Sequence, residues 1–408
     1  MSSDPLGDVV SQQYEQWVYP APIHDLEQWL QGSWQWFDPS HAHRLMWPDR
    51  DYSAGMDILV AGCGTNQAAI IAYTNPSARV VGIDVSDASL DHHRWLKDRY
   101  DLTNVDLHRL PIEDVASLRR DFDLIITTGV LHHMADPAAG MQALAACLRP
   151  EGVLAVMLYA DYGRFGVHLM QSAFRELGLS QDPGSLAIVH DALDQLGPLH
   201  PLQAYLRLAP DLDNDAGVVD TFLHGRERAY SIDECRELVE SAGLTFQDVF
   251  LKASYYPPRL ASSPFFAAVS ALPREQQWSV MQRINATNAC HYFLACRPDR
   301  PTASYAIDFD GGQPERYVPS FRKGCGLSGS TAYRHDWQRD LTPLETAIVG
   351  GVDGRRSIEE IVQAVVANGS FARSDPAEVT TTAIETFRAL WQWDFVAMGI
   401  PVGLFSSA

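Results

Sequence analysis

Two glycines and one aspartate have the spacing of a site that holds a nucleoside. Gly62 and Gly64 lie in the run 59–66, where an apolar strand should turn into a helix, and glycine there lets the backbone approach a ligand closely. Asp84 ends the next apolar run, where a carboxylate can accept two hydrogen bonds from a ribose diol. Together these residues predict a nucleoside site. A tight turn with a helix cap is the alternative.

The loop also separates two classes of nucleoside ligand. Dinucleotide-binding loops carry a third glycine three residues after the second, and the following helix N-terminus holds the pyrophosphate. Gln67 occupies that position here. A ligand without phosphates therefore fits the loop better than a dinucleotide does.

Six runs in order resemble the motifs of class I S-adenosylmethionine (SAM)-dependent methyltransferases. They are residues 59–66, 82–84, 110–114, 122–125, 128–137 and 148–153. The resemblance implies an α/β fold, a Rossmann-like seven-stranded sheet with an antiparallel last hairpin, and SAM over the ends of the first strands. Val60 departs from the acidic residue common before the loop, and Asn66 replaces the usual last glycine. Loop carbonyls and Asn66 are therefore expected to contact the methionine ammonium.

The resemblance also assigns the cofactor contacts. The methionine part of SAM would rest on the glycine loop, its ribose on Asp84, and the edge of its adenine near Ile112 and Glu113. For Glu113, a solvated carboxylate at a helix start is equally open. The expected cofactor-binding residues are Gly62, Gly64, Asn66, Asp84, Val85, Ile112, Glu113, Thr128 and Gly129.

Candidate catalytic residues follow the fourth predicted strand. Methyl transfer from a sulfonium is an in-line displacement, so the chain must mainly position the acceptor, and a base is needed only for a protonated nucleophile. His132 and His133 lie at the rim where the methyl group should point. Packing or capping histidines are the alternative.

An aromatic run precedes the sheet. Residues 13–20, QYEQWVYP, resemble a QYE-x-x-YP element of bacterial methyltransferases related to protein lysine methyltransferases. Tyrosines beside a sulfonium are favourable because aromatic faces attract cations. Tyr14 is therefore a catalytic candidate and Tyr19 a substrate-binding candidate, with an anchoring aromatic cluster as the alternative.

Further candidates lie between residues 220 and 230. Asp220 and His224 are catalytic candidates and Tyr230 a substrate-binding candidate, because dense polar groups beside apolar ones suit a lid over substrate. Tyr14, Asp220 and His224 rank above the histidine pair, since substrate selectivity usually resides in lid elements. A loop with a helix cap is the alternative.

Strands should alternate with helices from residue 56 to 160, which implies a parallel sheet. Residues 161–229 lack a strand period and should form a helical insertion, and strands at 245–252 and 291–297 would complete the sheet. The expected divisions are an N-terminal cap (1–48), the SAM-binding core (49–160), the lid insertion (161–229), the completion of the sheet (230–300) and a winged-helix-like domain (315–408).

The last of these divisions contains three amphipathic helices, at 343–352, 357–367 and 376–393, and a short hydrophobic end. The segment resembles the small winged-helix fold of PqqD-like peptide-recognition modules, which bind an extended peptide at a strand edge. A structural or dimerising appendage is the alternative. Acidic residues outnumber basic ones here, which disfavours DNA binding.

Composition limits the classes of partner that the protein could bind and the cellular compartment in which it could work. The 408 residues carry 51 acidic and 31 basic side chains, a formal charge of −20 that would repel nucleic acid. The longest apolar runs fall short of the about 18 residues of a membrane span, and no basic leader is seen. Six cysteines without a CxxC pair indicate reduced thiols and no structural zinc. We expect a cytoplasmic protein without bound metal, nucleic acid or membrane, and leave a homodimer open.

The sequence thus predicts a SAM-dependent methyltransferase. The leading acceptor is a nitrogen of a peptide or protein side chain, which follows from the lysine-methyltransferase resemblance and the terminal module. A small molecule methylated at O, N or S is the runner-up, because a lidded pocket suits a small ligand equally well. A degenerate cofactor-binding scaffold is the non-enzymatic alternative.

Overall fold

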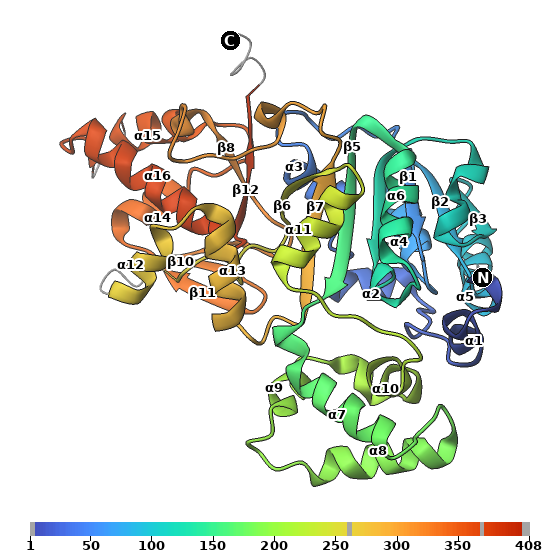
Figure 1. Ribbon diagram of the computed structural model, residues 1–408. Helices are drawn as coiled ribbons and strands as arrows, with labels where there is room; N and C mark the ends of the chain where they lie inside the picture. The colour runs from blue at the N-terminus through green and yellow to red at the C-terminus, as the bar shows by residue number, and fades with distance from the viewer. Residues whose placement is uncertain (1–4, 259–262, 368–370, 402–408) are drawn as a thin grey trace. The chain divides into compact units, whose positions relative to one another are not determined.

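The computed structural model describes residues 5–258, 263–367 and 371–401, and the chain divides into two compact units (Figure 1). The first comprises residues 1–37, 54–249 and 274–299, and the second residues 38–53, 250–273 and 300–408. Residues 38–53 and 250–273 thus group with the C-terminal segment. The divisions predicted from the sequence instead assign residues 38–48 to the N-terminal cap, 49–53 to the SAM-binding core and 250–273 to the completion of the sheet.

A seven-stranded sheet forms the centre of the first unit, in the order β3-β2-β1-β4-β5-β7-β6. β1 to β5 pair in parallel, whereas β7 runs antiparallel to both β5 and β6. The Rossmann-like sheet with an antiparallel last hairpin is therefore confirmed. The strands are β1 (Asp57–Ala61), β2 (Arg79–Asp84), β3 (Val105–Arg109), β4 (Phe122–Thr128), β5 (Leu148–Tyr159), β6 (Thr245–Val249) and β7 (Cys290–Cys296).

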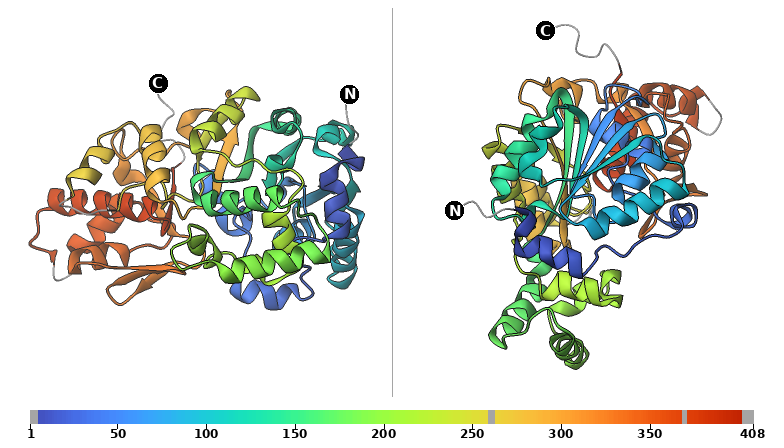
Figure 2. Two further views of the ribbon diagram at one scale, coloured as in Figure 1. Left: turned by 60° about the horizontal axis from the view of Figure 1, so that its bottom comes forward. Right: turned by 90° about the vertical axis from the view of Figure 1, so that its right-hand side faces the viewer.

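Helices cover both faces of this sheet (Figure 2), which explains why the central strand β1 is buried along its whole length. Parallel pairing brings the carboxyl ends of β1, β2 and β4 to one edge. The helices of the first unit outside the insertion are α1 (Val9–Gln16), α2 (Leu26–Gly32), α4 (Gln67–Thr74), α5 (Asp87–Arg99), α6 (Pro137–Ala146), α11 (Ile232–Ser241) and α13 (Arg274–Ile284).

Residues 161–229 fold into a helical insertion, drawn as one cluster below the sheet in Figure 1. Its helices are α7 (Phe165–Glu176), α8 (Pro183–Gln195), α9 (Leu202–Leu206) and α10 (Asp215–Phe222). They share a small apolar core that includes Phe174, Val189 and Phe222. The insertion then leads into α11, whose N-terminus carries the capping box of Ser231 and Glu234.

The second unit combines short antiparallel strands with helices. β12 (Val396–Gly399) pairs with β8 (Val318–Phe321), and a separate sheet has the order β11-β10-β9. These last strands are β9 (Gly326–Ser328), β10 (Thr331–Arg334) and β11 (Trp337–Asp340), and the helices are α3 (Pro39–Met46), α12 (Pro264–Ser270), α14 (Pro343–Val349), α15 (Ile358–Ala367) and α16 (Pro376–Gln392). The three last helices with these strands form a winged-helix-like part. Over the described ranges, the helices lack the combined length and apolar character that a membrane crossing would need.

Candidate cofactor and acceptor site

The glycine loop after β1 has a backbone that only glycine adopts without strain. Gly62 and Gly64 have φ angles of 72° and 56°, and a Cβ on Gly62 would lie 2.3 Å from a side-chain carbon of Val130. Asp84, at the end of β2, accepts hydrogen bonds from the Gly64 N–H at 2.8 Å and from the Ser86 N–H at 3.0 Å. The loop and the carboxylate are thus held together as one cradle.

This cradle lines a cavity of about 280 Å³ at the carboxyl edge of the sheet. Eight of the nine expected cofactor-binding residues line it, and they belong to the loop, to the end of β2 and the residue after it, to the start of the 3₁₀ helix at Ile112, and to the end of β4 and the glycine after it. The residues that line the cavity on this side are Gly62, Gly64, Asp84, Val85, Ser89, Leu110, Ile112, Glu113, Thr128, Gly129 and Val130. Burial raises the pKa of Asp84 to about 6, against the opposing effect of its backbone donors.

Asn66 is the cofactor candidate that the structure places elsewhere. Its side-chain oxygen accepts from the Ile23 N–H at 2.9 Å, and its amide donates to the Ala21 carbonyl at 3.0 Å. Thr65 donates to the Pro20 carbonyl at 2.8 Å. Asn66 therefore anchors the segment that carries Tyr19, instead of lining the cavity.

The far side of the cavity contains a buried carboxylate between two phenols. Asp220, on α10, is 2% exposed and accepts hydrogen bonds from Tyr14 at 2.8 Å and from Tyr159 at 3.2 Å. Burial and the Asp220 carboxylate raise the pKa of both phenols well above the ordinary value. Both tyrosines therefore stay protonated and act as donors. Tyr19 lines the same cavity.

Two neutral imidazoles, those of His133 and His224, lie next to the Tyr14 ring. The His133 Nδ1 donates to the Arg226 carbonyl at 3.0 Å, so its Nε2 carries the lone pair. The His224 Nδ1 accepts from the Arg226 N–H at 3.0 Å, so its Nε2 carries the proton and lies 3.4 Å from the Tyr14 hydroxyl. Burial lowers the pKa of each ring to about 3. His224 thus orients Tyr14, which in turn donates to Asp220.

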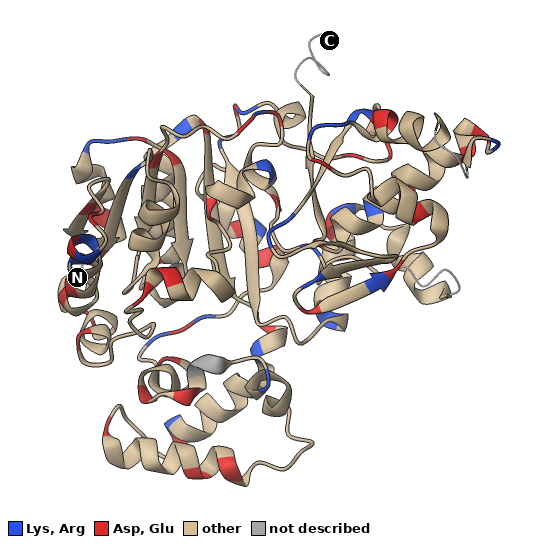
Figure 3. Ribbon diagram, turned by 180° about the vertical axis from the view of Figure 1, so that it is seen from behind, with Lys and Arg blue, Asp and Glu red and all other residues tan. Residues whose placement is uncertain are grey.

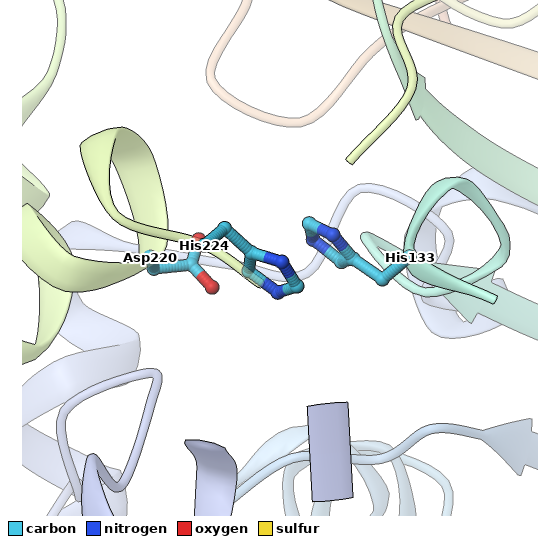
Figure 4. A group of neighbouring side chains, drawn as sticks. All are labelled: His133, Asp220 and His224. Carbon is cyan, nitrogen blue, oxygen red and sulfur yellow. The ribbon is translucent and has the colours of Figure 1, made fainter. Parts of the chain in front are cut away.

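His133, Asp220 and His224 are metal-ligand types whose ligand atoms lie within 4.8 Å of one another (Figure 4). The two rings, however, are stacked with centroids 3.8 Å apart and planes 14° apart. Lone pairs in two such parallel planes cannot both meet one ion at the about 2.0–2.1 Å of a zinc–imidazole bond, and the His224 Nε2 is protonated. This arrangement favours a hydrogen-bonded network over chelation.

The remaining candidates lie outside the cavity. His132 is 1% exposed, its Nδ1 accepts from the Tyr159 N–H at 3.3 Å, and its ring stacks on Tyr159 with centroids 3.9 Å apart. Tyr230 is 1% exposed and bridges to Ala160 through the backbone. His132 therefore packs behind the site, and Tyr230 packs where the insertion rejoins the sheet.

Three residues that sequence reasoning missed complete the site. Tyr159 ends β5, and Asp8 and Arg226 line the cavity as an ion pair, with a second contact from the Arg226 Nε to the His133 carbonyl at 2.8 Å. The hydrogen bond to Arg226 lowers the pKa of Asp8. One sequence feature could have pointed to Tyr159: it is a residue with a polar hydroxyl at the end of the apolar run 153–158.

Comparison with known proteins agrees with this geometry. The methyltransferase domain family matches residues 59–154. An uncharacterised protein of Synechococcus sp. is 31% identical over 271 residues, which cover 64% of this chain and 64% of that protein. The malonyl-[acyl-carrier protein] O-methyltransferase of Acetivibrio thermocellus is 28% identical over 136 residues, 33% of this chain and 47% of that enzyme. The match thus spans less than two thirds of either relative.

Among solved structures, PKMT2 from Rickettsia typhi in complex with AdoHcy has the same fold. The two share a TM-score of 0.66 at 16% identity, over 89% of this chain and 75% of that one. The glycine cradle, the Asp84 carboxylate and the matched domain agree on one cofactor. The chain therefore contains a methyltransferase domain over residues 59–154, an enzyme domain whose cofactor is SAM.

Proposed function

We propose that this protein transfers the methyl group of SAM to a nitrogen of a peptide or protein side chain. The observation that carries this proposal is Asp220, a carboxylate buried in the cavity wall opposite the cofactor cradle. An amine that enters as an ammonium ion would find there a negative charge and aromatic side chains, which both favour cations. A carboxylate or phosphate acceptor would be repelled.

The charges around Asp220 support a cationic acceptor. Of the two arginines nearest the network, Arg226 is paired with Asp8 and Arg164 with Glu227. In the described part of the chain no cation forms an ion pair with Asp220, whose hydrogen-bond partners are the two phenols. The acceptor itself would supply the missing positive charge.

The chain's own residues then have two tasks. A lysine-type amine has a reference pKa of about 10.4 and arrives protonated, so Asp220 holds the ammonium and accepts one of its protons, which frees the nitrogen lone pair. Tyr14 and Tyr159 fix the carboxylate, and His224 orients Tyr14. When bound in the cradle, SAM supplies an electrophilic methyl group.

A small-molecule acceptor is the second candidate. The cavity of about 280 Å³ is lined by residues of both α1 and the insertion, and a pocket of this size suits a small ligand. The peptide proposal is favoured by the PqqD-like resemblance of the C-terminal helices, which would recruit an extended segment.

Labelled SAM, incubated with the protein and a size-fractionated lysate of the source cells, separates these two candidates. Label in peptides or proteins supports the proposal, and label confined to small molecules supports the alternative. Asp220→Asn should lose the label in either case. Asp91→Asn, which breaks only the exposed pair with Arg94, is the matched control and should keep it. No label with any fraction would overturn the enzymatic proposal.

A further inference from the structure

The ring of Tyr159 is held on both faces. The Arg164 guanidinium lies 3.7 Å from the ring centroid, and the His132 ring stacks at 3.9 Å. Two groups this close cannot share one face, so Tyr159 is sandwiched between them. These contacts fix the plane of the ring, and the Tyr159 hydroxyl donates in that plane to the Asp220 Oδ2 at 3.2 Å.

Arg164 is itself fixed from the side of the insertion. It is 1% exposed, and its Nη2 donates to both Glu227 oxygens, at 3.0 and 2.9 Å. Its Nη1 donates to the Tyr205 hydroxyl at 2.9 Å. Gln171 adds a hydrogen bond to Glu227 at 3.2 Å. A planar guanidinium can donate from two of its nitrogens to Glu227 and Tyr205 and lie flat on the Tyr159 ring at the same time, whereas an ammonium has a single nitrogen and no flat face.

We propose that Arg164 is a positioning residue of the acceptor site, acting through Tyr159 on the Asp220 carboxylate. The proposal rests on the proposed function only for its effect on turnover. Arg164, Glu227 and Tyr205 come from the insertion, whereas Tyr159 ends a strand of the sheet. Arg164 thereby makes the geometry of Asp220 depend on how the insertion sits against β5.

The kinetic test is a double-mutant cycle on Arg164→Lys and Tyr159→Phe. Arg164→Lys alone should lower kcat about tenfold or more and leave the KM for SAM within about twofold, because the cradle is untouched. In the Tyr159→Phe background the same change should lower kcat by less than about twofold. Fully additive losses would mean a merely structural role. Arg228→Lys, whose guanidinium lies 4.6 Å from the Tyr230 ring outside the cavity, is the matched control.

A second measurement does not depend on turnover. With 3-fluorotyrosine in place of tyrosine, the ¹⁹F resonance that Tyr159→Phe removes belongs to Tyr159, and Arg164→Lys should shift it because a cation leaves the ring face. Glu227→Gln, which keeps the size of the side chain, should shift the same resonance if Arg164→Lys does not fold. An unmoved resonance in the folded variants would overturn the positioning proposal, while absent turnover with a shifted resonance would overturn only the proposed function.

Discussion

Two buried carboxylates divide the cavity at the residue scale, and their donors differ. Asp84 accepts from backbone N–H groups of the loop that follows β1 and of the turn that follows β2. Asp220 accepts from phenols that reach it from α1 and β5. Backbone donors fix the orientation of the Asp84 carboxylate, as the proposed contact with a ribose diol requires. The phenols of Asp220 leave the rest of its oxygen lone pairs for an acceptor.

Asp84 should make SAM binding depend on pH. Ribose hydroxyls donate to the charged carboxylate, so affinity should rise as the pH increases through about 6 and then level off. The same raised pKa lowers the free energy of unfolding as the pH rises from 3.8 to about 6, because the folded state holds the proton longer. Calorimetry of SAM binding between about pH 5 and pH 8 measures the first effect. Asp84→Ala should weaken binding about tenfold or more, and an unchanged affinity would place the ribose elsewhere.

Asp220 should govern turnover without governing cofactor affinity. Asp220→Asn keeps the size of the side chain but removes its charge, so kcat should fall about a hundredfold or more while the Kd for SAM stays nearly constant. His224→Gln should have a smaller effect in the same direction, because its contact with Tyr14 is long, at 3.4 Å. Steady-state kinetics with the acceptor found in the lysate measures both. If only His132→Ala or His133→Ala loses kcat, the base lies on the sheet rim instead.

Local spacing explains which of these residues could be predicted. Gly62, Gly64 and Asp84 follow consecutive strands, so a short pattern contains the whole cradle. Tyr14 and Asp220 were chosen from separate segments, and their hydrogen bond depends on how α1 and α10 fold over the sheet. The role of Tyr159 could not be predicted, because it needs β5, α10 and the Arg164 side chain together. The position of Asn66 outside the cavity lining could not be predicted either, because its side chain bonds residues 21 and 23, which are far away in the sequence.

At the scale of elements, the N-terminal segment forms one wall of the cavity. Asp8 pairs with Arg226, the Gln13 side-chain oxygen accepts from the Gly225 N–H at 3.1 Å, and Glu15 accepts from the Asp87 N–H at 2.5 Å. These contacts join α1 to the insertion on one side and to α5 on the other. The segment therefore holds Tyr14 over the acceptor end.

Removal of residues 1–22 should leave the sheet folded and impair turnover. Tyr14 and Tyr19 would be lost from the cavity wall, so kcat should fall about tenfold or more, while circular dichroism keeps the signal of the sheet and its helices. Asp8→Asn should weaken only the ion pair between α1 and Arg226. It should therefore raise the KM for SAM by less than the about tenfold change in kcat that is expected for the truncation. Full activity of the truncated chain would show that these tyrosines only anchor the segment.

Apolar continuity decided which elements could be predicted. β1, β4 and the later part of β5 are nearly continuous apolar runs, since helices cover both faces of the sheet. β9, β10 and β11 have three or four residues each and are partly exposed, so no alternating pattern marks them. α3 has an amphipathic pattern, but nothing local says that Arg44 donates to the Gly354 carbonyl at 2.8 Å.

At the scale of the whole molecule, the C-terminal segment does not form its compact unit alone. Asp394 accepts from the N–H groups of Lys252 at 2.8 Å and Ala253 at 2.9 Å, and Tyr255 of the same segment is 1% exposed. Deletion of residues 315–408 should therefore remove two hydrogen bonds to a carboxylate, each worth about 1.5–3 kcal/mol, and lower the Tm of the remaining chain. Differential scanning calorimetry measures this. An unchanged Tm would favour an independent module that serves recruitment alone.

The net charge of −20 gives the last prediction, which concerns how the acceptor arrives. Acidic residues lie on several helices of the insertion in the charge-coloured view (Figure 3). Two of them, Asp191 and Asp194, lie on α8. A lysine-rich peptide should be attracted by this charge, so its KM should rise as salt shortens the Debye length from about 10 Å at 0.1 M, while kcat stays constant. Asp191→Asn with Asp194→Asn should weaken this dependence. A neutral acceptor should show little change with salt, because no long-range attraction brings it to the cavity, and a salt-independent KM for every acceptor would contradict recruitment by charge.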